Sequence, residues 1–199
     1  MTIKAVLFDL GGVIVRTDYQ APRERLAERL NMTYEDLDQL VFNSDSAQKA
    51  SVGAMTAKEH WASVTRKLGR PVSEAQAIRE EFFAGDVVDR TLLDFIRSLR
   101  PRYKTGLISN AWPDLRQYIV EMKFEDAFDA QIISAEVGVT KPEAKIFQIA
   151  LEQLQIKANE AAFIDDVPAN VEAARGLGLH GIVFENPTQT LEELREILR

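Results

Sequence analysis

In the stretch IKAVLFDLGGVIV, residues 3–15, an apolar run breaks at an acid into a turn that contains two glycines. The run Ile3–Phe8 is typical of a strand that is buried on both faces of a parallel sheet. Asp9 then lies at the carboxyl end of that strand, and open parallel sheets bind their ligands beyond this edge. This stretch therefore predicts both a sheet and the place of a functional site.

Four further apolar runs follow along the chain, at Thr105–Ile108, Ala130–Ile133, Ala162–Ile164 and Gly181–Phe184. Apolar residues at helical spacing fill most of the gaps between these runs, and a last helix is expected at Leu191–Leu198. Strands that alternate with helices form parallel sheets, because the crossover helices cover both faces. The sequence therefore predicts an α/β fold built on a doubly wound parallel sheet.

The first gap is different, because between Asp18 and about Asp86 helical patterns follow one another and no strand is evident. Two residue pairs in it have the spacing of a capping box: Thr56 with Glu59, and Ser73 with Gln76. We therefore expect a compact helical cap at residues 19–86, inserted into a core domain that comprises residues 1–18 and 87–199.

Composition limits the functions that the chain can have. Its 199 residues are enough for one large domain or for a core with a smaller insertion. The net charge of −7 argues against nucleic acid as a partner, since that requires a basic face. The absence of cysteine excludes disulfides and thiolate sites, and oxygen ligands favour hard cations such as Mg²⁺. The first residues lack the features of a signal peptide and no apolar run is long enough for a membrane span, so we expect a cytoplasmic protein. The sequence does not indicate an oligomeric state.

Polar residues follow the predicted strands where the strands end: Asp9, Ser109 with Asn110, Lys141, and Asp165 with Asp166. A carboxylate such as Asp9 can attack phosphorus and form an acyl-phosphate, which divides a difficult hydrolysis into two easier displacements. Ser109 and Asn110 can donate hydrogen bonds to phosphoryl oxygens. Taken singly, each of these residues also has an ordinary interpretation as a turn, a cap or a solvated side chain.

Asp165 and Asp166 close an apolar strand, where two adjacent like charges are costly without a cation nearby. With Asp9 they offer oxygen ligands for an octahedral Mg²⁺, which completes its shell with water and substrate phosphate. Lys141 precedes Pro142 at the expected start of a helix, and its charge can neutralise both the nucleophile and an incoming phosphate. The order and spacing of these residues together favour phosphoryl transfer.

Four motifs resemble those of the haloacid dehalogenase superfamily: DLGGVIV, LISN, TKPEAKIF and IDDVPAN. The match spans the predicted core, and residues 19–86 lie where many members carry a helical cap. The resemblance implies a Rossmann-like sheet, a Mg²⁺ cofactor and an aspartyl-phosphate intermediate. By motif matching it makes Asp9 the nucleophile, Ser109 and Lys141 the phosphate-binding pair, and Asp165 and Asp166 ligands of Mg²⁺.

Gly11 departs from this pattern, because most phosphatases of the superfamily have a second Asp, the general acid–base, two residues after the nucleophile. The family uses the backbone carbonyl of this residue as a metal ligand, which Gly11 still offers. The DLG-G/N form resembles a subgroup that includes an α-glucose-1-phosphate phosphatase, which also has glycine here. Asp18, a little farther along the same loop, is a candidate substitute acid. The resemblance thus implies a phosphatase for small phosphate monoesters, with sugar phosphates as the first expectation.

Three other functions fit parts of the pattern. A 2-haloacid dehalogenase also uses an aspartate nucleophile, but the resemblance implies a bulky aromatic at the Gly11 position and no acid pair, which the IDD sequence opposes. A phosphate-accepting receiver module has its acid pair after the first strand and no helical insertion. A catalytically silent binding protein stays open because of Gly11.

The aromatic and histidine residues have less specific interpretations. His60 and His180 have no second ligand nearby in the sequence, so we predict no metal role for them. Trp112 is compatible with lining a substrate entrance or with packing in a core. Three phenylalanines are predicted to form the core of the cap: Phe42, Phe82 and Phe83.

Overall fold

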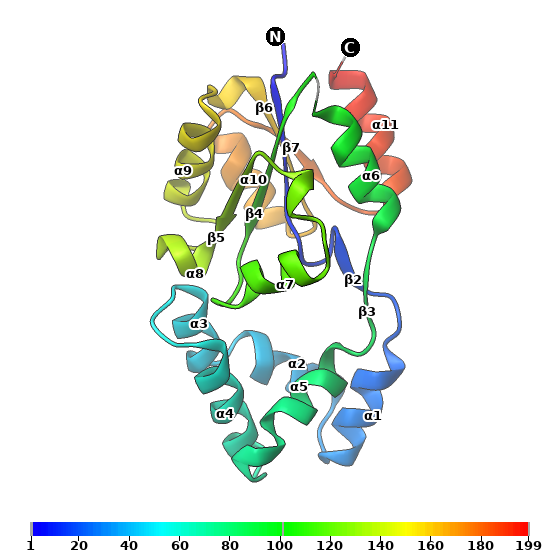
Figure 1. Ribbon diagram of the computed structural model, residues 1–199, viewed down its shortest axis with the longest axis vertical. Helices are drawn as coiled ribbons and strands as arrows, with labels where there is room; N and C mark the ends of the chain where they lie inside the picture. The colour runs from blue at the N-terminus through cyan, green and yellow to red at the C-terminus, as the bar shows by residue number, and fades with distance from the viewer. Residues whose placement is uncertain (1, 101, 199) are drawn as a thin grey trace.

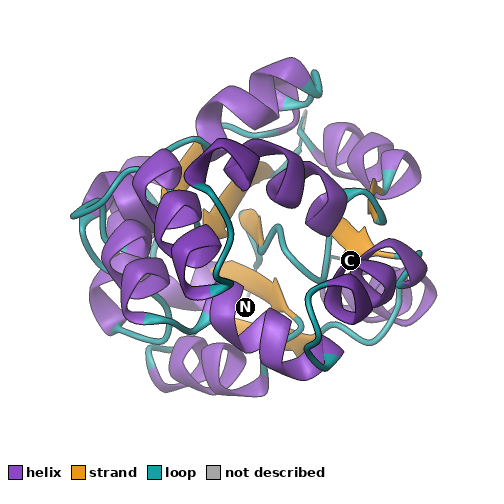
Figure 2. Ribbon diagram, turned by 90° about the horizontal axis from the view of Figure 1, so that it is seen from below, coloured by secondary structure: helices purple, strands orange, loops and turns teal. Residues whose placement is uncertain are grey.

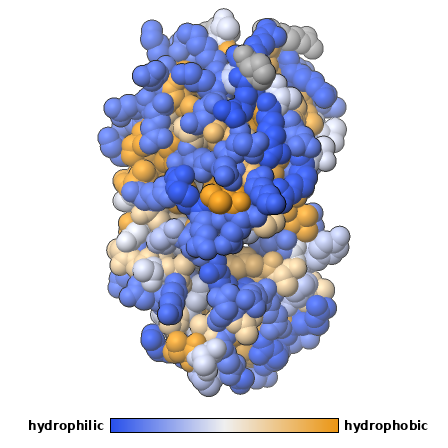
Figure 3. All heavy atoms as spheres, in the orientation of Figure 1, coloured by the Kyte–Doolittle hydropathy of each residue, from blue (hydrophilic) through white to orange (hydrophobic). Residues whose placement is uncertain are grey.

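The computed structural model describes residues 2–100 and 102–198, which form two groups of elements arranged one above the other in Figure 1. The upper group, here called the sheet lobe, contains a five-stranded sheet with helices around it. The lower group, the helical lobe, comprises the helices between residues 21 and 83. The molecule narrows between the two lobes, and hydrophobic atoms are visible at this waist in Figure 3.

The sheet consists of β1 (Ala5–Phe8), β4 (Lys104–Ser109), β5 (Ala130–Ile133), β6 (Ala161–Asp165) and β7 (His180–Val183). All five strands are parallel, in the order β5-β4-β1-β6-β7, which confirms the predicted doubly wound parallel sheet. From β1 the chain passes to one side for β4 and β5, and then to the other side for β6 and β7. The strand β1 therefore lies at the switch in strand order where such sheets bind ligands.

Helices cover both faces of this sheet. One face is covered by α6 (Arg90–Leu99), α7 (Leu115–Glu121) and α11 (Pro187–Ile197), and the other by α9 (Ala144–Leu154) and α10 (Pro168–Gly176). Shorter pieces are α8 (Ser134–Val137) and the 3₁₀ turns Glu125–Ala127 and Ala158–Glu160. Seen from the end of the helical lobe, the strands lie in the middle of a ring of helices (Figure 2). Within residues 2–100 and 102–198, no helix is long and apolar enough to cross a membrane.

The helical lobe consists of α1 (Ala21–Arg29), α2 (Tyr34–Phe42), α3 (Asp45–Ser51), α4 (Ala57–Lys67) and α5 (Ala75–Phe83), with a 3₁₀ turn at Val72–Glu74. It has a core of its own, formed by buried side chains of four helices: Leu26, Leu37, Val41, Trp61, Val64, Ile78 and Phe82. Thr56 and Glu59 form the predicted capping box at the start of α4. The prediction for Ser73 and Gln76 is wrong, because the 3₁₀ turn occupies this segment and α5 begins at Ala75 without a side-chain cap.

Two short strands that the sequence did not reveal connect the lobes, β2 (Val15–Thr17) and β3 (Asp86–Val88). They pair antiparallel, with Val15 opposite Val88 and Thr17 opposite Asp86. Each strand has only three residues, most of them half-buried, so neither shows the apolar run or the long alternation by which strands are recognised. The chain therefore leaves the sheet lobe and returns to it side by side in one ribbon.

Candidate active site

The predicted site residues converge at the carboxyl ends of β1, β4 and β6. Asp9 directly follows β1, Ser109 ends β4, Asp165 ends β6, and Lys141 comes from the loop between α8 and α9. Because β1 pairs with β4 on one side and with β6 on the other, Asp9 lies between the other two strand ends. Its backbone N–H donates a hydrogen bond to the Ile164 carbonyl at 2.8 Å, which continues the pairing with β6 up to the acid.

Lys141 is the centre of this group. Its Nζ lies 2.7 Å from Asp9 Oδ1 and 2.7 Å from Asp165 Oδ2, and it also donates to the Ile108 carbonyl at 2.9 Å. Its side chain is only 1% exposed, so it is not a solvated surface lysine. A buried ammonium group is stable when its three donors are all used and opposite charges lie beside it. Lys141 therefore holds the carboxylates of two different strands in one place.

Asp9 is buried and its two carboxylate oxygens have different surroundings. Oδ1 accepts hydrogen bonds from the Leu10 N–H at 2.7 Å and from Lys141, whereas Oδ2 accepts none from the described residues. Burial raises the pKa of Asp9 from 3.8 to about 7; Lys141 opposes this shift and the Asp165 carboxylate reinforces it. Asp9 thus presents one anchored oxygen and one free oxygen.

Asp165 is fully buried and uses both carboxylate oxygens within the protein. Oδ1 accepts from the Val167 N–H at 2.8 Å, Oδ2 accepts from Lys141, and the Asn170 side chain lies 3.1 Å from both oxygens. Each oxygen therefore has two donors. This carboxylate is held rigidly and has little capacity left for a further partner.

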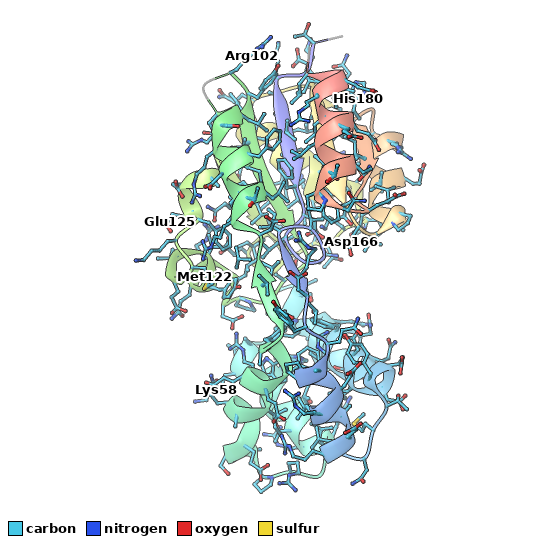
Figure 4. All side chains as sticks on the ribbon, turned by 90° about the vertical axis from the view of Figure 1, so that its right-hand side faces the viewer. Lys58, Arg102, Met122, Glu125, Asp166 and His180 are labelled. Carbon is cyan, nitrogen blue, oxygen red and sulfur yellow. The ribbon has the colours of Figure 1, made fainter. Side chains whose placement is uncertain are left out.

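Asp166, the next residue, is exposed and lies at the waist between the lobes (Figure 4). Its carboxylate packs on Gly12, where an added Cβ would come within 2.1 Å of Asp166 Oδ2. Gly12 also has a φ of +77°, which favours glycine there, whereas the contact alone would only force the Asp166 side chain to move. Burial and the neighbouring Asp165 raise the pKa of Asp166. One carboxylate oxygen from each of Asp9, Asp165 and Asp166 lies within 4.8 Å of the other two.

Ser109 and Asn110 have different surroundings, although the sequence suggested one role for both. Ser109 is buried, and its hydroxyl forms no hydrogen bond with another described residue, which leaves it free for a ligand. The Asn110 side chain instead clamps the backbone of Lys141: Oδ1 accepts from the Lys141 N–H at 2.7 Å, and Nδ2 donates to its carbonyl at 2.9 Å. This clamp joins residues 31 positions apart, so no sequence pattern reveals it.

Gly11 and Asp18 lie outside this network. A Cβ added to Gly11 would have no described atom within 4 Å apart from its chain neighbours, so the position admits the first atom of a side chain. Asp18 follows β2, is exposed, and lies 3.7 Å from Arg16 in a weak ion pair. It has no contact with the three clustered carboxylates among the described residues.

The two histidines lie apart from the cluster. His180 begins β7 at the outer edge of the sheet, well away from Asp166 in Figure 4. His60 is buried in the helical lobe, where its Nδ1 is 3.0 Å from Ser46 Oγ and its ring packs on Trp112 with 4.4 Å between ring centroids. Trp112 thus leaves the sheet lobe and enters the aromatic core of the helical lobe, a contact that the sequence left undecided.

The protein is an α/β protein with a doubly wound parallel sheet. An acidic site with a buried lysine lies at the switch point of this sheet, and the helical lobe is inserted after the first strand. Residues 3–178 match the haloacid dehalogenase-like hydrolases, and the chain belongs to this family.

Several characterised proteins are similar over nearly the whole chain. A D-ribitol-5-phosphate phosphatase of Bacteroides thetaiotaomicron is 26% identical over 207 residues, which cover 98% of each protein. A sesquiterpene phosphatase of Aspergillus oryzae is 26% identical over 200 residues, 99% of this chain and 97% of the relative. The bifunctional epoxide hydrolase 2 of Rattus norvegicus is 25% identical over 217 residues, but this chain spans only 39% of its length.

Solved structures agree with these similarities. An enzyme of the HAD family from Bacteroides thetaiotaomicron superposes with a TM-score of 0.82 at 25% identity, covering 96% of this chain and 99% of that chain. A complex of a HAD family enzyme from the same organism with magnesium and inorganic phosphate has a TM-score of 0.79 at 26% identity, covering 94% and 98%.

Proposed function

We propose that this protein is a Mg²⁺-dependent phosphatase that hydrolyses small phosphate monoesters through an aspartyl-phosphate formed on Asp9. The position of Lys141 carries most weight, because its Nζ lies 2.7 Å from both Asp9 and Asp165 in a buried site that holds more carboxylates than cations. A fixed positive charge beside a nucleophilic carboxylate suits the binding of an anionic phosphate. The relatives named as phosphatases support the same chemistry.

The free Oδ2 of Asp9 attacks phosphorus in the first step, while the bond from phosphorus to the alcohol oxygen breaks and that oxygen takes up a proton. In the second step a water molecule attacks phosphorus, the bond to Asp9 breaks, and inorganic phosphate leaves with the carboxylate restored. Ser109, whose hydroxyl is free, donates a hydrogen bond to a phosphoryl oxygen, and Lys141 binds the phosphoryl group through its charge, exchanging one of its three present hydrogen bonds for it. Asn110 acts through Lys141, whose backbone it clamps.

The carboxylates of Asp9, Asp165 and Asp166 fit a Mg²⁺ ion. Their oxygens lie within 4.8 Å of one another, and Mg²⁺ prefers oxygen ligands. One lysine leaves the group with an excess of negative charge, and the pKa values of Asp9 and Asp166 are raised by burial first and by the neighbouring Asp165 carboxylate second. When bound, Mg²⁺ supplies positive charge to the phosphoryl oxygens. The magnesium and phosphate complex of the similar Bacteroides enzyme supports this assignment.

Within this set the acids differ in what they can offer. Asp9 and Asp166 each have a carboxylate oxygen that no other described residue binds, and the Gly11 carbonyl, on the exposed turn after Asp9, accepts no hydrogen bond from another described residue. Asp165 has two donors on each oxygen, so it becomes a ligand only by giving up one of these hydrogen bonds. We therefore rank Asp165 after Asp9, Asp166 and Gly11 as a Mg²⁺ ligand.

Because Gly11 stands where the general acid would be, the departing alcohol needs its proton from another donor. In this proposal Asp18 or a water molecule supplies it, and Asp18 approaches only if the ribbon moves from its present position beside Arg16. The Asp18→Asn variant then slows hydrolysis of a sugar phosphate more than that of p-nitrophenyl phosphate, whose leaving group needs little protonation. Equal losses on the two substrates exclude Asp18 as the acid.

The helical lobe, residues 19–86, is in this proposal the cap that closes over the site and selects the substrate. The two phosphatase relatives differ in the alcohol named, a polyol in one and a sesquiterpene in the other. A small phosphorylated metabolite is the expected partner, and sugar phosphates are the first class to test.

The decisive experiment measures phosphate release from p-nitrophenyl phosphate with and without Mg²⁺, with Asp9→Asn as the control. We expect turnover that requires Mg²⁺ and is lost in Asp9→Asn, together with a phosphorylated intermediate that is trapped in acid on the wild-type chain alone. Turnover that survives in Asp9→Asn contradicts the proposal.

A catalytically silent binding protein is the second candidate, and Gly11 is the observation that favours it. The open space around a Cβ at Gly11 permits a direct test with Gly11→Asp, which adds the missing acid. A wild-type protein that binds phosphate and Mg²⁺ without turnover, and a Gly11→Asp variant that gains turnover, supports this second candidate.

A further inference from the structure

The loop after β4 joins the predicted phosphate site to the helical lobe. Trp112 lies in this loop three residues after Ser109, and its ring stacks on Phe42 with centroids 6.0 Å apart and 22° between the planes. The Trp112 ring also contacts His60 and Trp61, with ring centroids 4.4 Å and 5.9 Å away. Aromatic rings of both lobes therefore meet within a few residues of the phosphate-binding hydroxyl.

An ion pair fixes the same loop. Arg79 of α5 pairs with Asp114, two residues after Trp112. This contact and the stacked rings hold the loop against the helical lobe from two sides, so the side chain of Trp112 has a fixed place. Trp112 therefore presents a fixed aromatic ring three residues after Ser109 in the same loop.

Phe42 supplies the exposed part of this surface. It is the last residue of α2 and stays 42% exposed, although its ring also touches Phe82 and Phe83. The sequence predicted this residue for the core of the cap, which its exposure corrects. Val167, next to Asp166 on the sheet side, is a second exposed apolar residue beside the site, at 44%. Exposed apolar surface of this kind is stabilised when an apolar group covers it.

The polar side chains nearest Phe42 in the chain form hydrogen bonds within the helical lobe. Asn43 donates to the Gln39 side chain at 3.0 Å, and Ser44 caps α3 by accepting from the Ala47 N–H at 3.4 Å. His60 uses Nδ1 on Ser46, while its Nε2 is buried and has no partner in the described part of the chain. The ring faces of Phe42 and Trp112 themselves offer a polyol no replacement for the hydrogen bonds to water that it would lose there.

We propose that Phe42 and Trp112 bind the organic group of the substrate, and that the protein prefers phosphate monoesters of apolar alcohols, bearing a ring or a branched hydrocarbon chain, over those of polyols. This preference rests on the phosphatase function proposed above. It reverses the expectation of sugar phosphates, because the exposed part of this surface consists of ring faces, and the two nitrogens of the aromatic cluster that no described residue binds, His60 Nε2 and Trp61 Nε1, are buried.

The test compares benzyl phosphate with D-ribitol 5-phosphate, using acetyl phosphate as a reporter of phosphoryl transfer. Both esters release a primary alcohol, so they differ mainly in the organic group. We expect kcat/KM for benzyl phosphate to exceed that for D-ribitol 5-phosphate by about tenfold or more. If D-ribitol 5-phosphate is hydrolysed as well as benzyl phosphate or better, and acetyl phosphate is also hydrolysed, the preference is wrong but the phosphatase function stands. No turnover of acetyl phosphate overturns the phosphatase function and the preference with it.

Two variants at Phe42 assign the preference to the aromatic surface. Phe42→Ala removes the ring, and Phe42→Gln replaces it with a donor and an acceptor, so the benzyl to ribitol ratio falls about tenfold in the first and further in the second. Val72→Ala, which truncates an equally exposed valine (43%) elsewhere on the helical lobe, is the matched control and leaves the ratio unchanged. A ratio that does not respond to either Phe42 variant, in proteins whose circular dichroism shows them folded, overturns the assignment.

Discussion

Lys141 in the sheet lobe and Arg23 in the helical lobe are both buried cations, with side chains 1% and 5% exposed. Lys141 lies between two carboxylates that are themselves buried, Asp9 and Asp165. Arg23 lies between Asp38 and Asp86, which reach solvent with 35% and 18% of their side chains exposed. Its guanidinium also covers the ring of Phe82, 3.9 Å from the centroid.

The difference between the two is the balance of charge around them. Arg23 is matched by acids that water can also solvate, and it ties α1 to α2 and to the ribbon, so its role is structural. Lys141 is the cation beside a cluster of three carboxylates, two of them buried, and burial raises the pKa of Asp9 to about 7 although Lys141 opposes the shift. A carboxylate cluster with only one cation beside it can bind a further cation, and the two cations together can bind an anionic substrate.

The largest effect that we expect comes from Lys141→Met. This change removes the only side-chain cation in contact with Asp9 among the described residues, so kcat/KM for p-nitrophenyl phosphate falls by about 10³-fold. Steady-state kinetics with saturating Mg²⁺ measure it, and Lys145→Met, on the exposed surface of α9, is the control. Activity within tenfold of the wild type contradicts a role for Lys141 in phosphoryl transfer.

Arg23→Met tests the other half of the comparison, the structural role of Arg23. Loss of a buried cation leaves Asp38 and Asp86 without their partner, and we expect the free energy of unfolding to fall by about 3 kcal/mol, at the low end for buried pairs because both acids reach water. Urea denaturation measures this change, while kcat/KM of the folded protein stays within about tenfold.

The matched control for Arg23 is Arg70→Met, which removes an exposed pair with Glu74 on the same lobe. Exposed pairs of this kind contribute about 0.5 kcal/mol or less. If Arg23→Met costs no more than Arg70→Met, or if it abolishes turnover in the folded protein, the contrast between a structural and a reactive cation is lost.

Asn110→Ala sharpens the comparison, because it tests whether Lys141 needs its backbone clamp. The clamp fixes the position of the Lys141 backbone, so its removal lowers kcat by about tenfold with little change in KM. The matched control is Asn43→Ala, whose amide bonds only within α2. A rise in KM at unchanged kcat instead assigns Asn110 to phosphate binding, the role that the sequence suggested.

The smallest effect concerns pH and Mg²⁺. The pKa of Asp9 is about 7 in the folded ion-free protein and 3.8 in the unfolded chain, so the folded state binds the extra proton between these values. Stability of the ion-free protein therefore declines as pH rises from about 4 to 7, and Mg²⁺ offsets this above pH 7. We expect Mg²⁺ to raise Tm by about 3 °C more at pH 8 than at pH 5.

Thermal denaturation of wild type and Asp9→Asn at both pH values measures this difference. The comparison with Asp9→Asn is needed because His60, whose pKa burial lowers to about 4, destabilises the fold in the opposite direction as pH falls below 6.5. His60 is the same in both proteins, so its contribution cancels. An equal Mg²⁺ shift at the two pH values is incompatible with an ionised Asp9 at the ion.

The sequence predicted the sheet and the convergence of its strand ends for a simple physical reason. Strands buried on both faces need continuous apolar runs, and parallel strands bring their carboxyl ends to one edge, so the pattern of residues alone places Asp9, Ser109 and Asp165 together. Lys141 was placed with them through its motif rather than through burial. That its charge is almost completely hidden follows from packing that no local pattern records.

The remaining features depend on contacts between distant residues. The clamp of Asn110 on Lys141 and the entry of Trp112 into the helical lobe each join segments that lie far apart in the chain. The ribbon was missed because three half-buried residues per strand leave no periodicity to detect. The exposure of Phe42 was missed because composition distinguishes an apolar side chain from a polar one, but not a covered ring from an open one.

The ribbon of β2 and β3 has a mechanical consequence. Its two strands are cross-linked by backbone hydrogen bonds, by Arg16 to Asp89 at 2.9 Å near the sheet lobe, and by Thr17 to Asp86 at 2.7 Å near the helical lobe. Two connecting segments without mutual hydrogen bonds would let the lobes twist, slide and bend independently. The paired ribbon resists twisting and sliding, because either motion would break the hydrogen bonds between its strands, and it bends most easily out of its own plane. The ribbon therefore favours a rocking motion of the lobes over twisting and sliding, and the Arg79–Asp114 pair and the Trp112 rings, which also join the lobes, hold that motion in the closed position described.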